Sequence, residues 1–104
     1  DPALTKDLGK ILVKNKEDYI TTRIKHPNFS GLQKDQDSGG YIPEWIVRQI
    51  RYDFNGERIL AVENDISISQ DPYLKFKFVT NDKGTLTVSA TDTKSTIFLK
   101  SKEI

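Results

Sequence analysis

The stretch that decides the fold is IRYDFNGERIL, residues 50–60. Ile50, Tyr52 and Phe54 alternate with polar residues, as on a strand that buries one face. Asn55-Gly56 follows directly, and both central positions of a two-residue type I′ turn require the positive φ angle that Asn and Gly adopt most readily. The stretch therefore predicts a β-hairpin.

Alternating apolar residues continue over most of the 104-residue chain and predict further strands. The predicted strands occupy residues 9–14, 17–25, 44–54, 57–62, 73–80, 85–91 and 96–101. Asn81-Asp82-Lys83-Gly84 predicts a second hairpin, and residues 92–95 predict a third turn without Gly. Such strands and turns are typical of an antiparallel immunoglobulin-like β-sandwich, so we expect an all-β fold of about seven strands. We expect one domain over residues 8–104, after a flexible leader at residues 1–7.

The predicted strand 44–54 carries apolar side chains on both faces. Ile46 belongs to the face that the hairpin buries, whereas Trp45 and Val47 lie on the opposite face. If the opposite face is uncovered, it is a candidate protein interface, because an exposed Trp is a typical anchor. In the alternative interpretation, the polar loop at 26–43 folds over this face.

Composition excludes several kinds of chemistry. The chain has no Cys and one His, which excludes disulfides, thiol nucleophiles, Cys-rich zinc sites and multi-histidine metal centres. Its 16 Lys and Arg against 15 Asp and Glu give a net charge of +1, so bulk attraction to nucleic acid or a membrane is not expected. No segment has the roughly 18–20 apolar residues of a membrane helix, and no signal peptide is visible. These properties favour a binding or partner domain without a cofactor.

Three local patterns each allow two interpretations. His26-Pro27 either binds a ligand or caps the end of a strand through nearby backbone groups. Asp35-Gln36-Asp37-Ser38-Gly39 resembles the start of a calcium loop, but Trp45 stands where that loop requires a Glu, so we expect no metal. Lys75 and Lys77, close to Tyr73, form either a nucleic-acid surface or a solvated strand face that protects a sheet edge. For the lysines the balanced charge favours the solvated face.

Four segments together resemble the SoxZ family, the small subunit of the SoxYZ sulfur-carrier complex of bacterial thiosulfate oxidation. His26-Pro27-Asn28-Phe29-Ser30-Gly31 is similar to the family's H-P-x-x-x-G, and Gly40-Tyr41-Ile42-Pro43 to its glycine followed by I-P. Tyr52-Asp53-Phe54-Asn55-Gly56 looks like the family's strand ending in N-G. Ile68-Ser69-Gln70-Asp71-Pro72-Tyr73-Leu74-Lys75-Phe76 resembles I-S-x-N-P-Y-L-x-F, with Asp71 in place of Asn. The motifs keep the family's order and spacing over about residues 10–101.

The resemblance implies a non-catalytic, periplasmic subunit that forms a heterodimer with a SoxY-like carrier protein. In that family, SoxY holds sulfur intermediates on the cysteine of a C-terminal G-G-C-G-G arm. The small subunit would help to present this arm, through transient contacts, to the enzymes that oxidise thiosulfate. Without its partner, an exposed sheet edge would allow self-association. The residues that we expect to contact the partner are Ile42, Pro43, Trp45, Val47, Pro72 and Tyr73.

One departure and two other functions stay open at this point. Residues Ala90–Ser95 stand where the family often has W-x-D-x-x-G, which allows a divergent homologue with a different partner. An immunoglobulin-like adhesion or ligand-binding module unrelated to sulfur would have the same strand pattern. A hydrolase would have to use His26. A desulfoferrodoxin-like sandwich enzyme is excluded, because its iron site requires several His and a Cys.

Overall fold

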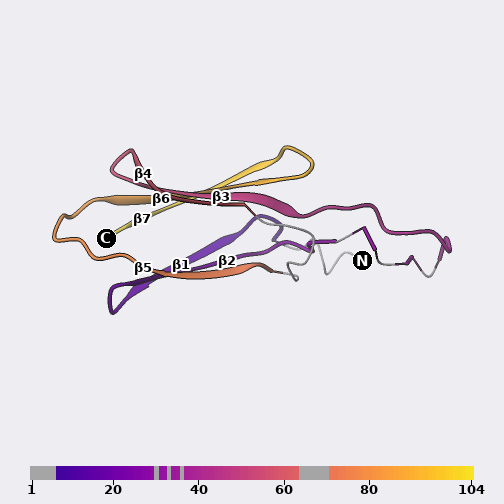
Figure 1. The fold of residues 1–104 in the computed structure, drawn as a ribbon, viewed down its shortest axis with the longest axis horizontal. Helices are drawn as coiled ribbons and strands as arrows, with labels where there is room; N and C mark the ends of the chain where they lie inside the picture. Colours follow the sequence, from indigo (N-terminus) through magenta and orange to yellow (C-terminus); the bar gives the residue numbers. More distant parts are fainter. Residues whose placement is uncertain (1–6, 30, 33, 36, 64–70) are drawn as a thin grey trace.

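Two antiparallel sheets pack face to face in the computed structural model (Figure 1). The structure describes residues 7–29, 31–32, 34–35, 37–63 and 71–104. Within these residues, all regular secondary structure is β-strand. No helix in this described part of the chain has the length and apolar character needed to cross a membrane. Residues 1–6 of the predicted leader lie outside the described residues.

Seven strands form the sandwich, which confirms the predicted fold class. The first sheet has the order β1-β2-β5 and consists of β1 (Ile11–Lys16), β2 (Tyr19–Ile24) and β5 (Tyr73–Lys77). The second sheet has the order β4-β3-β6-β7 and consists of β4 (Glu57–Glu63), β3 (Val47–Phe54), β6 (Thr85–Asp92) and β7 (Ile97–Glu103). The third, sixth and seventh strands share a sheet, as in immunoglobulin domains. The fourth strand pairs with β3 here instead of joining the first sheet.

The turns confirm two of the three predicted connections. Asn55 and Gly56 have φ angles of 51° and 83°, so the β3–β4 hairpin forms as predicted. The turn after Asp92 also joins a paired hairpin, and Ser95 takes the positive φ of 64° without a Gly. The hairpin predicted at Asn81–Gly84 is wrong, because β5 and β6 belong to different sheets and this segment crosses between them.

A further hairpin joins β1 to β2 through Glu17 and Asp18. Their φ angles of 54° and 66° place both residues in the left-handed region, as a type I′ turn requires. The predicted strand 17–25 therefore begins two residues too early, because β2 begins at Tyr19. Neither Glu nor Asp is a strong signal for this turn, so the sequence pattern did not separate it from the strand.

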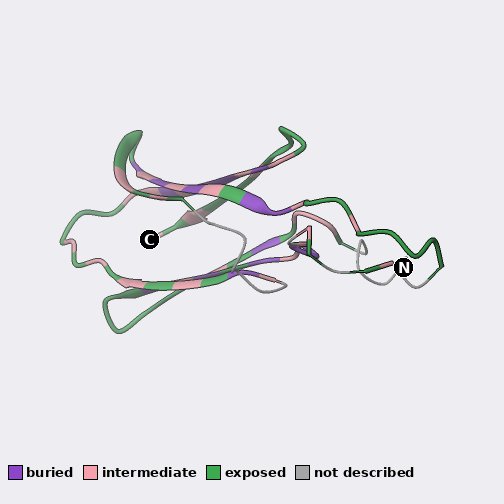
Figure 2. Cartoon of the chain, turned by 45° about the vertical axis from the view of Figure 1, so that its right-hand side comes forward, coloured by how far each residue is buried: buried purple, intermediate pink, exposed green. Residues whose placement is uncertain are grey.

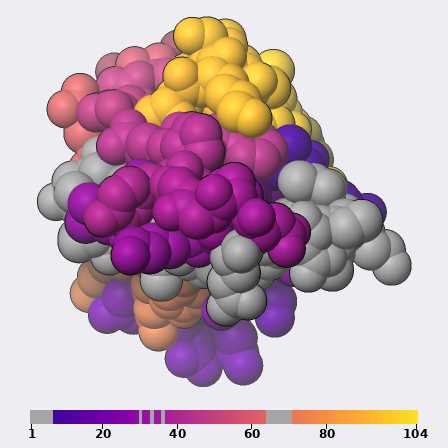
Figure 3. Space-filling model, turned by 90° about the vertical axis from the view of Figure 1, so that its right-hand side faces the viewer, coloured from indigo at the N-terminus to yellow at the C-terminus, as the bar shows by residue number. Residues whose placement is uncertain are grey.

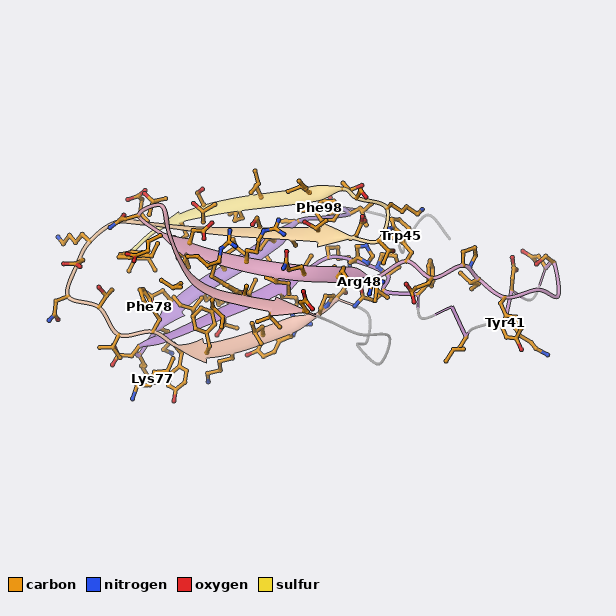
Figure 4. The ribbon with its side chains drawn as sticks, turned by 45° about the horizontal axis from the view of Figure 1, so that its top comes forward. Tyr41, Trp45, Arg48, Lys77, Phe78 and Phe98 are labelled. Carbon is orange, nitrogen blue, oxygen red and sulfur yellow. The ribbon has the colours of Figure 1, made fainter. Side chains whose placement is uncertain are left out.

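The core lies between the sheets, where the buried segments of the strands face one another (Figure 2). Tyr52 of β3 is fully buried and meets Phe76 of β5 edge to face, with ring centroids 4.7 Å apart. Fully burying a large apolar side chain contributes about 1.5–3 kcal/mol, so these contacts are the main attraction between the layers. In Figure 4 the Phe78 side chain likewise lies between the sheets.

The alternation predicted for residues 44–54 breaks at the start of β3. The register of β3 against β6 shifts between Val47 and Gln49, which is a β-bulge or similar irregularity. Ile46 and Val47 are consequently both fully buried, whereas Arg48 is exposed. The prediction that Val47 shares an exposed face with Trp45 is therefore wrong, since one extra residue in a strand turns the following side chains to the other face.

The β2–β3 loop, residues 25–46, projects from one end of the sandwich (Figure 1). The molecule measures 54 × 23 × 22 Å, and the loop extends it along its longest axis. Its two sides run antiparallel and pair at Phe29–Trp45 and Lys34–Tyr41. The loop does not fold over the sandwich, so the outer part of Trp45 stays accessible at the base of the projection.

Candidate functional site

The base of the β2–β3 loop is fixed by His26, whose side chain is fully buried. The Asn28 backbone N–H donates to His26 Nδ1 at 3.0 Å, and the His26 N–H donates to a carboxylate oxygen of Asp71 at 3.0 Å. The Val47 N–H donates to Asn28 Oδ1 at 2.8 Å, which ties the start of the loop to β3. His26 therefore caps the end of β2 through backbone groups, as the structural interpretation of the sequence predicted.

Asp92, at the end of β6, connects the loop to the second sheet. One carboxylate oxygen accepts the backbone N–H groups of Lys94 and Thr96, both at 3.0 Å. The other accepts the Trp45 indole N–H at 2.8 Å and lies 3.4 Å from His26 Nε2. Because His26 Nδ1 accepts a hydrogen bond, its proton is on Nε2 and points to Asp92.

Burial and hydrogen bonding set the charges in this cluster. Burial lowers the pKa of His26 below its ordinary value of 6.5, and this outweighs the opposing attraction of Asp92. Burial acts to raise the pKa of Asp92, but the hydrogen bonds from Trp45, Thr96, His26 and Lys94 lower it overall. The cluster is therefore a neutral histidine beside an ionised carboxylate with several hydrogen-bond donors, which is a structural arrangement rather than a proton-transfer pair exposed to substrate.

Trp45 joins this buried cluster to the surface (Figure 4). Its ring contacts His26 edge to face at a centroid distance of 5.0 Å, and Lys94 Nζ lies 3.6 Å from its centroid. The outer side of Trp45 borders a mainly apolar hollow of about 250 Å³, which we call the loop hollow. The loop hollow is lined by Phe29, Ile42, Pro43, Glu44, Trp45 and Lys94. Figure 3 views this end of the molecule, where the loop lies across the front below the C-terminal strand.

The structure brings together three of the six residues expected to contact a partner. Ile42, Pro43 and Trp45 line the loop hollow, with Pro43 exposed and the other two half-buried. Val47 and Pro72 are buried, so the prediction of a surface role for these two is wrong. The Val47 error follows from the bulge in β3. The Pro72 carbonyl accepts the Ile24 N–H at 3.0 Å, so Pro72 leads into β5 inside the fold.

Tyr73 lies on a different surface from Trp45. Its ring is 53% exposed on the outer face of the first sheet, where the Arg23 guanidinium lies 5.3 Å from its centroid. A second hollow of about 340 Å³ is found there, lined by Leu12, Lys14, Thr21, Arg23 and Tyr73. The two hollows share no lining residue, so the six predicted contact residues do not form one site.

Asp35 and Asp37 belong to a turn at the tip of the β2–β3 loop. Asp35 Oδ1 accepts the Asp37 N–H at 2.9 Å, and the Asp35 carbonyl accepts the Gly39 N–H at 2.9 Å. These bonds form a local turn of the kind that Asp favours. In the part of the chain that the structure describes, no three His, Cys, Asp or Glu side chains lie together in a way that could hold a metal.

Sequence reasoning missed the part that Asp92 plays. The sequence placed Asp92 in a turn, where its bonds to Lys94 and Thr96 could be expected, but its contacts with His26 and Trp45 join residues 66 and 47 positions apart. No local sequence pattern predicts a contact between residues so far apart in the chain. Phe29 was likewise missed, although it pairs with Trp45 through two backbone hydrogen bonds of 2.7 and 2.8 Å.

Comparison with known protein families identifies a match over most of the chain. The model of the SoxZ family, described as "Sulphur oxidation protein SoxZ", matches residues 12–103. A search of curated proteins finds no match.

Solved structures with similar folds include two superoxide reductases. The protein from Nanoarchaeum equitans has a TM-score of 0.57 at 15% identity, over 91% of this chain and 89% of that one. A neelaredoxin variant from Ignicoccus hospitalis has a TM-score of 0.61 at 16% identity, over 100% of this chain and 86% of that one. A hypothetical protein from Pyrococcus horikoshii has a TM-score of 0.57 at 18% identity, over 90% of this chain and 83% of that one. At these identities the likeness concerns the fold alone.

Proposed function

Since this chain belongs to the SoxZ family of sulphur oxidation proteins, we propose that it is the non-catalytic subunit of a sulfur-carrier pair. Its proposed partner is a SoxY-like protein that holds sulfur intermediates on the cysteine of a C-terminal Gly-Gly-Cys-Gly-Gly arm. The family match over residues 12–103 is the observation that carries the proposal. A chain without Cys cannot bind sulfur through a thiol of its own, which agrees with this division of labour.

The proposed contact with the partner is the loop hollow. It combines an aromatic side chain with neighbouring apolar groups, and buried aromatic anchors carry much of the energy of protein interfaces. Trp45 is held in place before any partner arrives, by its hydrogen bond to Asp92 and its backbone pairing with Phe29. A side chain that is already ordered loses little conformational entropy on binding, so this arrangement favours affinity.

The proposed location of the pair is the periplasm, where the carrier would meet the enzymes of thiosulfate oxidation. Transient contacts with those enzymes would serve the presentation of the loaded arm. The similar solved structures favour no second function, because identities of 15–18% relate them to this chain by fold only.

The experiment is a binding titration between this chain and a SoxY-family protein, with two matched surface variants. Ile42→Asp places a charge in the loop hollow, and Leu99→Asp places the same charge on the exposed outer face of the second sheet. We expect Ile42→Asp to weaken pairing at least tenfold and Leu99→Asp to change it less than twofold. Thermal unfolding of each variant controls for folding.

Two outcomes would contradict this account at different levels. If Leu99→Asp alone weakens pairing, the contact lies on the second sheet and the assignment of the loop hollow is wrong. If the unmodified chain does not pair with SoxY-family proteins at tens of micromolar, the proposed function itself is wrong.

A further inference from the structure

The outer face of the first sheet presents nine side chains in a regular array. β1, β2 and β5 each contribute three residues, and the strand register aligns them in three rows. We call this surface the basic face; its rows are Leu12-Arg23-Tyr73, Lys14-Thr21-Lys75 and Lys16-Tyr19-Lys77. All nine side chains are exposed except Thr21, which is half-buried. Figure 4 shows Lys77 pointing away from the sandwich on this side.

Charge is strongly segregated onto the basic face. Five of the nine residues are Lys or Arg, and β1, β2 and β5 contain no Asp or Glu. The whole chain has a net charge of only +1, so the rest of the molecule is acidic. Alternate residues of one strand lie about 6.8 Å apart, which places Lys14 and Lys16 of β1, and likewise Lys75 and Lys77 of β5, within one Debye length of about 8 Å at physiological salt. Their mutual repulsion destabilises the free chain, and an anionic partner would relieve it.

The acidic residues next to these strands do not neutralise the face. Glu17 and Asp18 are confined to the β1–β2 turn at one end. At the other end, Asp71 is engaged by Lys25, at 3.4 Å, and by the backbone N–H of His26. Among the described residues, no acidic side chain is therefore paired with the cations at the centre of the basic face.

The hollow on this face adds an apolar element. Leu12 is 51% exposed and Tyr73 is 53% exposed, and both line the space of about 340 Å³. Lys14 and Arg23 line the same space. Such a hollow fits one apolar side chain whose neighbours carry carboxylates, because the hydrophobic contact and the ion pairs can then form together.

The aromatic rings distinguish a protein partner from a nucleic acid. Single-stranded nucleic acids stack their bases on open aromatic faces. Here Lys75 Nζ lies 4.7 Å from the Tyr19 ring centroid, and Arg23 lies 5.3 Å from the Tyr73 centroid. Both rings are already engaged by cations of this chain, so carboxylates match the surface better than bases do.

We propose that the basic face docks an acidic, extended segment of a partner protein, with one apolar side chain seated in the hollow that Leu12 and Tyr73 help to line. This surface shares no lining residue with the loop hollow, so the inference goes beyond the pairing proposed above. The same chain could then hold its pairing partner at the loop hollow while an acidic protein approaches the first sheet.

The test uses fluorescence anisotropy with a labelled ten-residue peptide of Glu and Asp that contains one central Leu. The double variant Lys14→Glu/Lys75→Glu reverses two charges in the middle row of the basic face. The control Lys83→Glu/Lys100→Glu reverses two exposed lysines outside the face, so both double variants carry the same net charge. We expect the first variant to bind the peptide at least tenfold more weakly, and the control to change binding less than threefold.

Two further arms make the outcome decisive. Replacing the central Leu of the peptide by Ser should weaken binding to the unmodified chain, because the hollow then loses its apolar occupant. An oligothymidine of the same charge should bind more weakly than the peptide. If both double variants lose peptide affinity equally, binding depends only on the net charge of the chain and the proposal is wrong. Tighter binding of the oligothymidine than of the peptide would also overturn the proposal. Pairing with the SoxY-family protein should survive Lys14→Glu/Lys75→Glu, which separates this test from that of the proposed function.

Discussion

Replacing Asp92 by Asn tests whether one buried carboxylate holds the loop to the sandwich. Asp92 is 3% exposed and accepts hydrogen bonds from Trp45, Lys94 and Thr96, with His26 Nε2 at 3.4 Å. In Asp92→Asn, the remaining amide oxygen can still accept the two backbone N–H groups. The new NH₂ group then faces the indole N–H and the imidazole N–H, so donors face donors.

The structure gives a magnitude for this change. A hydrogen bond to a charged group contributes about 1.5–3 kcal/mol, and a buried donor left without a partner costs about 1–3 kcal/mol. The other tautomer of His26 gives no rescue, because a proton on Nδ1 would face the Asn28 N–H. We therefore expect the free energy of unfolding to fall by about 2–4 kcal/mol, which corresponds to roughly 8–16 °C in Tm at about 4 °C per kcal/mol, the lower end of the range for small domains.

Urea denaturation followed by tryptophan fluorescence measures the effect, because Trp45 is the chain's single Trp and lies in the cluster. The matched control is Asp53→Asn, which removes a 26% exposed carboxylate 2.7 Å from the more exposed Arg58 and should cost under about 1 kcal/mol. A loss below about 0.5 kcal/mol in Asp92→Asn, or a loss equal to that of the control, would refute the view that Asp92 organises this end of the molecule.

Three further changes test other parts of the account. Because burial lowers the pKa of His26, the folded chain binds fewer protons than the unfolded chain near pH 6. The free energy of unfolding should therefore fall as the pH drops from 7 to 5, and urea midpoints measured across this range should record the fall. In His26→Gln the dependence of the urea midpoint on pH should be weaker. Replacing Glu17-Asp18 by Asn-Gly should raise Tm by several degrees in calorimetry, since both positions have a positive φ, and an unchanged or lower Tm would contradict the turn. Gly84→Ala should cost about 1–3 kcal/mol, because its methyl group would collide with the Asn55 side chain, while the methyl group of Gly40→Ala would make only an ordinary contact, 3.7 Å from Ser38 Oγ, and should cost less in the same assay.

Local signals in the sequence were sufficient for most of each strand and for two hairpins, at Asn55-Gly56 and at residues 92–95. Asn55-Gly56 encodes its turn directly, because both residues accept the required φ angles. The β1–β2 turn could not be found in this way, since Glu17 and Asp18 adopt positive φ only under the constraint of the paired strands. The path from β5 to β6 was also hidden, because a tight turn and a crossing between sheets use the same turn residues.

The candidate site was only partly accessible from the sequence. Ile42, Pro43 and Trp45 are close in the chain, so their shared surface follows from proximity once the loop projects. Val47 was misplaced because a bulge reverses the two-residue period without any change in composition. The bonds of Asp92 to His26 and Trp45 arise only when the two sheets pack, which no pattern within a single strand encodes.

The basic face could not be predicted from the sequence of any single strand. Lys75 and Lys77 on one strand resemble an ordinary solvated surface, and the net charge of +1 supports that interpretation. Only the register of β1, β2 and β5 places three further cations beside them and leaves the acidic residues elsewhere. The segregation is a property of the sheet and not of any one segment.

The most direct test of the central claim is the mass of the particle formed when this chain is mixed with a SoxY-family protein. Size-exclusion chromatography with light scattering, at about 20 µM of each chain and with the carrier's cysteine kept reduced, measures it. We predict one peak with the summed mass of one copy of each chain. Two separate peaks, each with the mass of a chain alone or of its self-associated form, would contradict the claim that this protein is the partner subunit of a sulfur carrier.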